Sequence, residues 1–134
     1  MRRRAKHETH RAEDEQWVSI SVASSEGKWD DGWVGGTASF TIDVPPSAMA
    51  IRLVGYKPDW IPNLLLFARA SEKEVRRQIM AVGHFVVDVP MAHASGRLEV
   101  VTRSEPVIVP SEVWESQEHR GLSWVFVGVE ARVK

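Results

Sequence analysis

The sequence contains no cysteine among its 134 residues. Disulfide bonds and thiolate zinc sites are therefore excluded, and the fold must be stabilised by the burial of apolar side chains. No apolar run approaches the roughly 18 residues of a membrane-spanning helix. The arginines at positions 2–4 are followed by charged residues, where a secretory signal would need an apolar stretch. We therefore expect a soluble, cytoplasmic protein.

An excess of one charge sign is also lacking, because 17 lysines and arginines face 18 aspartates and glutamates. Such a chain has no strong overall field to attract nucleic acid or an anionic membrane, so neither is expected as a partner. The length is typical of one domain, and the 43% of hydrophobic residues is sufficient for a core.

The first sixteen residues differ in kind from the rest of the chain. Basic and acidic residues alternate there with almost nothing apolar between them. This composition predicts a flexible polar arm over residues 1–16, followed by one domain over residues 17–134.

Apolar and polar residues alternate from Trp17 onward, which is the period of strands with one buried face. The alternating runs cover residues 18–22, 38–44, 49–53, 85–89 and 98–100, and turn-forming residues separate them. We predict an all-β fold with eight or nine antiparallel strands in a two-sheet sandwich, of the jelly-roll or immunoglobulin-like kind. A small barrel is the structural alternative.

The last segment, residues 122–133, is apolar on both faces at its start. Trp124 and Phe126 share one parity, whereas Val127 and Val129 share the other. This pattern predicts a central strand that is covered on both sides.

Residues 71–82 allow two interpretations. Ser71 and Glu74 have the spacing of a helix capping box. The β-branched residues Val75, Ile79 and Val82 and the short length favour instead a hairpin, with strands over 64–67 and 75–81 and a turn at 71–74.

Several short motifs follow one another in a distinctive order. They are Asp31-Gly32-Trp33-Val34-Gly35, Leu53-Val54-Gly55-Tyr56-Lys57-Pro58, Gly83-His84-Phe85, Val107-Ile108-Val109-Pro110 and Glu118-His119-Arg120-Gly121-Leu122-Ser123. In this order they resemble the β-sandwich accessory domain found attached to many bacterial glycosyltransferases. The resemblance implies a noncatalytic module that binds carbohydrate or docks onto a glycosyltransferase domain.

Tryptophans in predicted loops supply the candidate binding residues. Indole rings stack on the C–H faces of sugars, while acidic side chains accept hydrogen bonds from the hydroxyls. The candidate carbohydrate- or partner-binding residues are Trp29, Asp31, Trp33, Trp60, Glu118 and Arg120. Loop tryptophans can instead plug the end of a sandwich, and we assign Trp17, Trp114 and Trp124 to core or edge packing.

Arg120 has a second interpretation that needs no ligand. Its guanidinium lies close in sequence to Glu115 and Glu118, and it can fork onto a carboxylate and bind loop carbonyls. We favour this role as a loop staple over direct contact with a sugar or a partner.

Catalytic and metal-binding patterns are lacking. The sequence has no Gly-x-Ser-x-Gly elbow for its histidines to serve and no phosphate-binding loop. Asp30 and Asp31 lack the spaced series of carboxylates that calcium loops use. We therefore expect no enzyme, no cofactor and no metal. The alternative to a carbohydrate-handling module is a structural domain that self-associates into a homo-oligomer.

Overall fold

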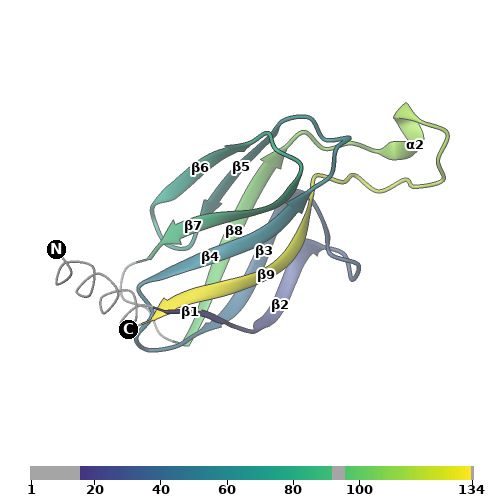
Figure 1. The fold of residues 1–134 in the computed structure, drawn as a ribbon. Helices are drawn as coiled ribbons and strands as arrows, with labels where there is room; N and C mark the ends of the chain where they lie inside the picture. The colour runs from purple at the N-terminus through teal and green to yellow at the C-terminus, as the bar shows by residue number, and fades with distance from the viewer. Residues whose placement is uncertain (1–15, 92–95, 134) are drawn as a thin grey trace, which may run out of the picture.

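The computed structural model describes residues 16–91 and 96–133 (Figure 1). These residues form β1 (Gln16–Ser19), β2 (Val22–Lys28), β3 (Trp33–Val44), β4 (Ala50–Lys57), β5 (Leu64–Arg69), β6 (Glu74–Ile79), β7 (Gly83–Pro90), β8 (Gly96–Glu105), α2 (Pro110–Val113) and β9 (Trp124–Val133). The all-β prediction is confirmed. The predicted polar arm lies outside the described residues, except for Gln16, which pairs with Val133 at the start of β1. In the described part of the chain, no helix is long and apolar enough to cross a membrane.

The strands pair in antiparallel fashion in the order β6-β5-β8-β3-β9-β4-β7, with β1 added to β9 and β2 added to β3. Figure 1 shows β4, β7 and β9 in front of β3, β5 and β8. The two groups are joined where Trp33 pairs with Val125 and Val34 pairs with Trp124. Because this link makes the sheet continuous and the molecule barrel-like, the predicted division into two sheets is not confirmed.

The core lies between the two groups of strands. Trp124 and Phe40 are its largest fully buried side chains, as expected for Trp124, and Phe40 stacks on Phe126 with the ring centroids 4.5 Å apart. Alternate residues of β3, β4, β5, β7, β8 and β9 supply most of the rest of this core, and β1, β2 and β6 add partly buried side chains. Each fully buried large apolar side chain contributes about 1.5–3 kcal/mol, which offsets part of the conformational entropy lost on folding.

β9 is central in its hydrogen bonding, since it lies between β3 and β4, but its outer face is not covered. Gly55 pairs with Phe126 whereas Val54 pairs with Gly128, so Val127 is an extra residue at a register shift. A shift of this kind reverses the side on which the following residues lie. Val129 is therefore buried and Val127 is 52% exposed, which corrects the expectation that both share one covered face.

The hairpin interpretation of residues 64–81 is confirmed, because β5 pairs with β6. Leu64 lies opposite Ile79 at one end of the pairing, and Arg69 lies opposite Glu74 at the other. The predicted alternation over residues 18–22 is found, because Val18, Ile20 and Val22 pack against the core, but the run is divided between two strands. β1 ends at Ser19 and pairs with β9, whereas β2 begins at Val22 and pairs with β3. The chain changes partner strands between them, where the amide of Ile20 donates to the carbonyl of Val129 over 3.0 Å.

A long connection between β8 and β9 projects from one end of the molecule and carries α2 (Figure 1). Ile108 and Leu122 form a two-way backbone bridge, with N···O distances of 2.9 and 2.8 Å. This bridge closes the base of the connection and fixes where it leaves the strands.

Candidate functional site

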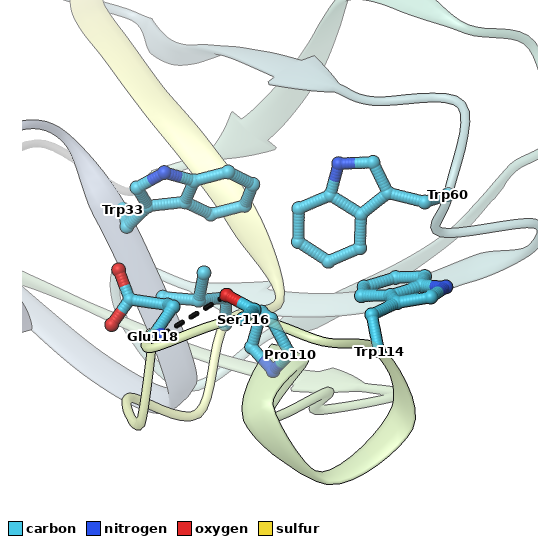
Figure 2. A pocket seen from close by; sticks show the side chains of 7 residues that line it. Trp33, Trp60, Pro110, Trp114, Ser116 and Glu118 are labelled. Atoms are coloured by element: carbon cyan, nitrogen blue, oxygen red, sulfur yellow. Dashed lines mark hydrogen bonds between the residues drawn. The ribbon is translucent and has the colours of Figure 1, made fainter.

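Three segments meet at this end of the molecule and border an open cleft of about 490 Å³. They are the first residue of β3, the loop between β4 and β5, and the connection that carries α2. The lining residues are Trp33, Trp60, Pro110, Trp114, Ser116, Glu118 and Leu122, and we refer to this site as the aromatic cleft (Figure 2).

The three indole rings of the aromatic cleft lie against one another. The ring centroids of Trp33 and Trp60 are 5.3 Å apart with an interplanar angle of 38°, and those of Trp60 and Trp114 are 5.3 Å apart at 86°. Figure 2 shows Trp33 and Trp60 side by side, with Trp114 next to Trp60. The arrangement offers apolar ring surface in several orientations around one opening.

A buried lysine fixes the loop that carries Trp60. Lys57 is the last residue of β4 and is only 1% exposed. Its ammonium group donates hydrogen bonds to the carbonyl oxygens of Pro58, at 3.3 Å, and Ile61. A buried charge is unfavourable unless it is hydrogen-bonded, so these carbonyls are held on the two sides of Trp60.

Trp114 does not belong to the core or to a strand edge, contrary to the sequence-based expectation. It follows α2, lines the aromatic cleft and is 48% exposed. Its amide donates to the carbonyl of Pro110 over 2.8 Å, and the amide of Ser111 donates to the carbonyl of Glu118 over 2.8 Å. Pro110, at the first helical position, was the sequence signal that could have indicated this short helix.

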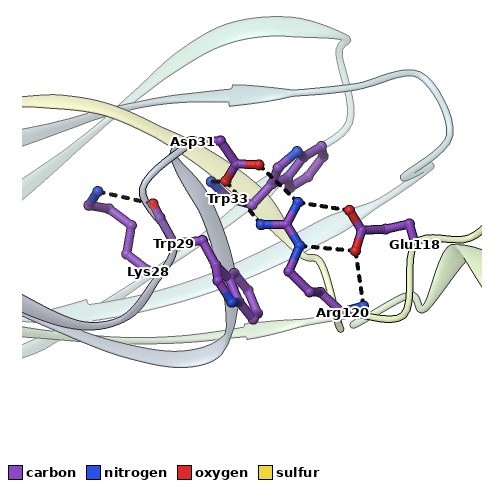
Figure 3. Close-up of polar contacts among 6 residues, drawn as sticks. All are labelled: Lys28, Trp29, Asp31, Trp33, Glu118 and Arg120. Carbon is purple, nitrogen blue, oxygen red and sulfur yellow. Dashed lines mark hydrogen bonds and ion pairs between the residues drawn. The ribbon is translucent and has the colours of Figure 1, made fainter.

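Arg120 links two of the segments that surround the cleft (Figure 3). It forks onto Glu118, through Nε to Oε2 at 3.0 Å and Nη2 to Oε1 at 2.7 Å. It also forks onto Asp31, through Nη1 to Oδ1 at 3.1 Å and Nη2 to Oδ2 at 2.8 Å. Glu118 was foreseen as a partner of Arg120, whereas Asp31 was not. The guanidinium therefore links the turn before β3 to the segment after α2.

The hydrogen bonds from Arg120 hold the carboxylates of Glu118 and Asp31 in the ionised state. Hydrogen bonds from the side chain of Arg120, and then from its backbone amide, lower the pKa of Glu118 from 4.5 to about 2. The side chain of Arg120 also lowers the pKa of Asp31, and both carboxylates, Glu118 most strongly, raise the pKa of Arg120. At neutral pH two carboxylates share one guanidinium, so Glu118 brings a permanent hydrogen-bond acceptor to the edge of the cleft.

The candidate residues fall into three groups. Trp33, Trp60 and Glu118 line the aromatic cleft. Asp31 and Arg120 do not line it, but Arg120 donates hydrogen bonds to both Asp31 and Glu118. Trp29 is not part of the lining, because its ring lies over Gly35 and 5.1 Å from the guanidinium carbon of Arg120. Sequence reasoning missed the cleft residue Trp114 and the buried Lys57.

The aromatic cleft can stack apolar ring faces and accept hydrogen bonds. Histidine is not among its lining residues, so the hydroxyl of Ser116 has no imidazole beside it there. This hydroxyl accepts a hydrogen bond from the amide of Glu118 over 3.1 Å. Within residues 16–91 and 96–133, no group of three or more His, Cys, Asp or Glu side chains is placed to hold a metal ion.

Neither a family model nor a curated relative matches the chain. Among solved structures, the cycloalternan-forming enzyme from Listeria monocytogenes, in complex with a pentasaccharide substrate, is 17% identical with a TM-score of 0.46. That similarity covers 92% of this chain but only 11% of the enzyme, so the chain spans about a tenth of its length.

Two carbohydrate-binding modules are also similar to the chain. CBM36, solved with calcium and xylotriose, is 11% identical with a TM-score of 0.41, over 87% of this chain and 98% of the module. CsCBM6-3 from Clostridium stercorarium, solved with cellobiose, is 13% identical with a TM-score of 0.38, over 88% of this chain and 91% of that one. A link to glycosyltransferases is not shown by these structures.

Proposed function

We propose that this chain is a noncatalytic carbohydrate-binding module and that its ligand occupies the aromatic cleft. The observation that carries the proposal is the meeting of Trp33, Trp60 and Trp114 around one opening with the ionised Glu118 at its edge. These residues come from the start of β3, from the loop between β4 and β5, and from the connection between β8 and β9, so the fold, and not local sequence, brings them together.

The cleft has the chemistry that a pyranose ring requires. The apolar C–H face of a sugar packs on flat aromatic rings, and its hydroxyls seek acceptors at the rim. Trp60 and Trp114 supply two faces that lie nearly at right angles. Glu118 and Ser116 supply the polar atoms. The half-exposed indole of Trp114 lies next to that of Trp60, which lies next to Trp33, and a contiguous apolar surface of this kind suits contact with a ligand.

The electrostatics of the site favour binding over hydrolysis. Glycoside hydrolysis uses two carboxyl groups, one of which stays protonated at working pH because its pKa is raised. Arg120 lowers the pKa of both Glu118 and Asp31, so neither can act as the acid near neutral pH. The site therefore suits binding without catalytic activity of its own.

A second candidate function is docking of the same surface onto another protein, either a glycosyltransferase domain, as the motif order suggests, or a second copy of this chain. The observation that favours it is again the exposed Trp114, because tryptophan is enriched at the centres of protein interfaces.

Binding measurements on single tryptophan variants separate these functions. The protein is applied to an oligosaccharide array, and each hit is measured by calorimetry with the wild type, Trp60→Ala and Trp114→Ala. Trp17→Ala is the matched control, because Trp17 packs under Arg52 and does not line the cleft. We expect both cleft variants to bind about tenfold more weakly or worse, a loss of ~1.4 kcal/mol or more, and the control to bind normally.

Two results would contradict the proposal. One is binding that neither cleft variant weakens, which would place the sugar elsewhere. The other is the absence of any oligosaccharide ligand together with an oligomer or complex that Trp114→Ala dissociates, which would support docking.

A further inference from the structure

Acidic side chains lie beside every tryptophan of the aromatic cleft. Asp30 and Asp31 precede Trp33, Asp59 precedes Trp60, and Glu112, Glu115 and Glu118 accompany Trp114. All of these carboxylates except Glu118 are exposed, and Glu118 is partly exposed at the cleft wall. The whole chain carries a net charge of only −1, so this end of the molecule is more acidic than the chain as a whole.

In the part of the chain that the structure describes, the lysines and the arginine near the cleft are hydrogen-bonded or buried. Arg120 donates four side-chain hydrogen bonds to Asp31 and Glu118. Lys28 donates to the carbonyl of Trp29 over 3.2 Å, and Figure 3 shows it on the other side of Trp29 from Arg120. Lys57 is buried against the carbonyls of Pro58 and Ile61. No Lys, Arg or His is among the residues that line the cleft, and His119 is exposed outside it.

From this distribution of charge we propose that the saccharide bound in the aromatic cleft carries no negative charge. The inference rests on the proposed function and narrows its ligand to neutral and amino-bearing oligosaccharides. It excludes uronate, sialylated and sulfated ones.

The reason is that, within residues 16–91 and 96–133, the lining of the cleft contains no cation to compensate a ligand's negative charge. Proteins that recognise carboxylate or sulfate groups present a guanidinium or ammonium group with donors available to the ligand. Here a ligand carboxylate would lie next to Glu118, and it would compete for a guanidinium that already gives four of its five N–H groups to Asp31 and Glu118. A neutral hydroxyl would not be repelled by Glu118, and an ammonium group on the sugar would be attracted to it.

Matched ligands test the inference. An array carries neutral oligosaccharides, the same backbones with carboxylate or sulfate groups, and the same backbones with amino groups. It is probed with the wild type, with Trp60→Ala and with the triple variant Asp59→Asn, Glu112→Gln, Glu115→Gln. These three carboxylates are exposed, so the triple variant is expected to fold.

We expect every ligand whose binding depends on Trp60 to be neutral or amino-bearing, with its acidic counterpart at least about tenfold weaker. The difference in affinity between the neutral and the acidic ligands should become smaller in the triple variant. It should also become smaller at about 0.5 M NaCl, where charges beyond several ångströms are screened. An acidic oligosaccharide that binds as tightly as its neutral counterpart, and loses binding in Trp60→Ala, would overturn this inference and leave carbohydrate binding intact. The absence of any Trp60-dependent ligand would overturn both.

Discussion

Asp31 and Arg120 are 89 residues apart in the chain and form a two-pronged ion pair, with N···O distances of 3.1 and 2.8 Å. The same guanidinium binds Glu118, which lies on the segment that also carries Trp114. Two walls of the aromatic cleft are therefore tied together by one side chain that does not itself line the cleft. The shape of the cleft depends on this link.

Arg120→Lys should weaken the link although it keeps the charge. A lysine has one ammonium group and cannot fork onto two carboxylates as a planar guanidinium does. We expect a melting temperature lower by a few degrees, which is the effect of losing one well-placed interaction in a domain of this size. Differential scanning calorimetry measures it. Arg97→Lys is the control, because Arg97 makes a single contact with Asp43 and its side chain is 70% exposed. Equal melting temperatures for the two variants would contradict the role of Arg120.

Acid should destabilise the protein in part through Glu118. The folded-state pKa of this group, about 2, lies below its ordinary value of 4.5. A lowered pKa gives stability that is present above about pH 4.5 and is lost as the pH falls towards 2. Melting temperatures measured from pH 7 to pH 2 should show this loss, and Arg120→Ala should show a smaller loss because the carboxylates then titrate normally.

The pH profile needs one control, because Arg52 also lowers the pKa of Asp88. Arg52→Ala removes that contribution and leaves the one from Glu118. If Arg120→Ala and the wild type lost stability in parallel over the whole acid range, the assigned pKa of Glu118 would be wrong.

Lys57→Met should loosen the loop that presents Trp60. Methionine fills a similar volume but cannot donate to the carbonyls of Pro58 and Ile61. A buried acceptor without a donor costs about 1–3 kcal/mol. Hydrogen exchange of the backbone amides in residues 59–63 should accelerate, and sugar binding at Trp60 should weaken. Lys73→Met, at an exposed position, should change neither. A Lys57→Met variant with unchanged exchange would show that the ammonium group does not hold the loop.

Gly27→Ala should be far more destabilising than Gly96→Ala. Both glycines have a positive φ, +80° and +84°, so both substitutions carry similar backbone strain. A Cβ at Gly27 would lie 2.2 Å from the carbonyl oxygen of Thr37, whereas a Cβ at Gly96 would meet nothing within 4 Å. We expect an additional loss of about 1–3 kcal/mol at Gly27, measured by urea unfolding. Similar losses at both sites would mean that β2 moves away from β3 at little cost.

The strands were largely predictable from the sequence because a period of two is a local property. Phe40 and Ile42 alternate with polar residues and are buried in β3, and the hairpin of β5 and β6 followed from its β-branched residues. The face occupied by Val129 was not predictable, because the extra residue at Val127 appears only when β9 is paired with β4.

The residues of the aromatic cleft were predictable in part. Trp33 and Trp60 were identified because each was predicted in a loop close to an aspartate, and both line the cleft, although Trp33 is the first residue of β3. Trp29 has the same local surroundings and lies outside the lining, while Trp114 was assigned to packing and lines it. Which tryptophans share a surface depends on how distant connections meet, and local sequence does not contain that information.

The sequence by itself determined that this protein is built of antiparallel strands, that it contains no cysteine, and that Trp29 and Trp60 lie in connections between strands. These properties follow from composition and from the alternation of side chains along an extended backbone. Only the tertiary structure decided that the sheet is continuous, that three indoles converge, and that one guanidinium joins Asp31 to Glu118. Each of these is a contact between segments far apart in the chain, and such contacts are fixed by strand pairing and core packing.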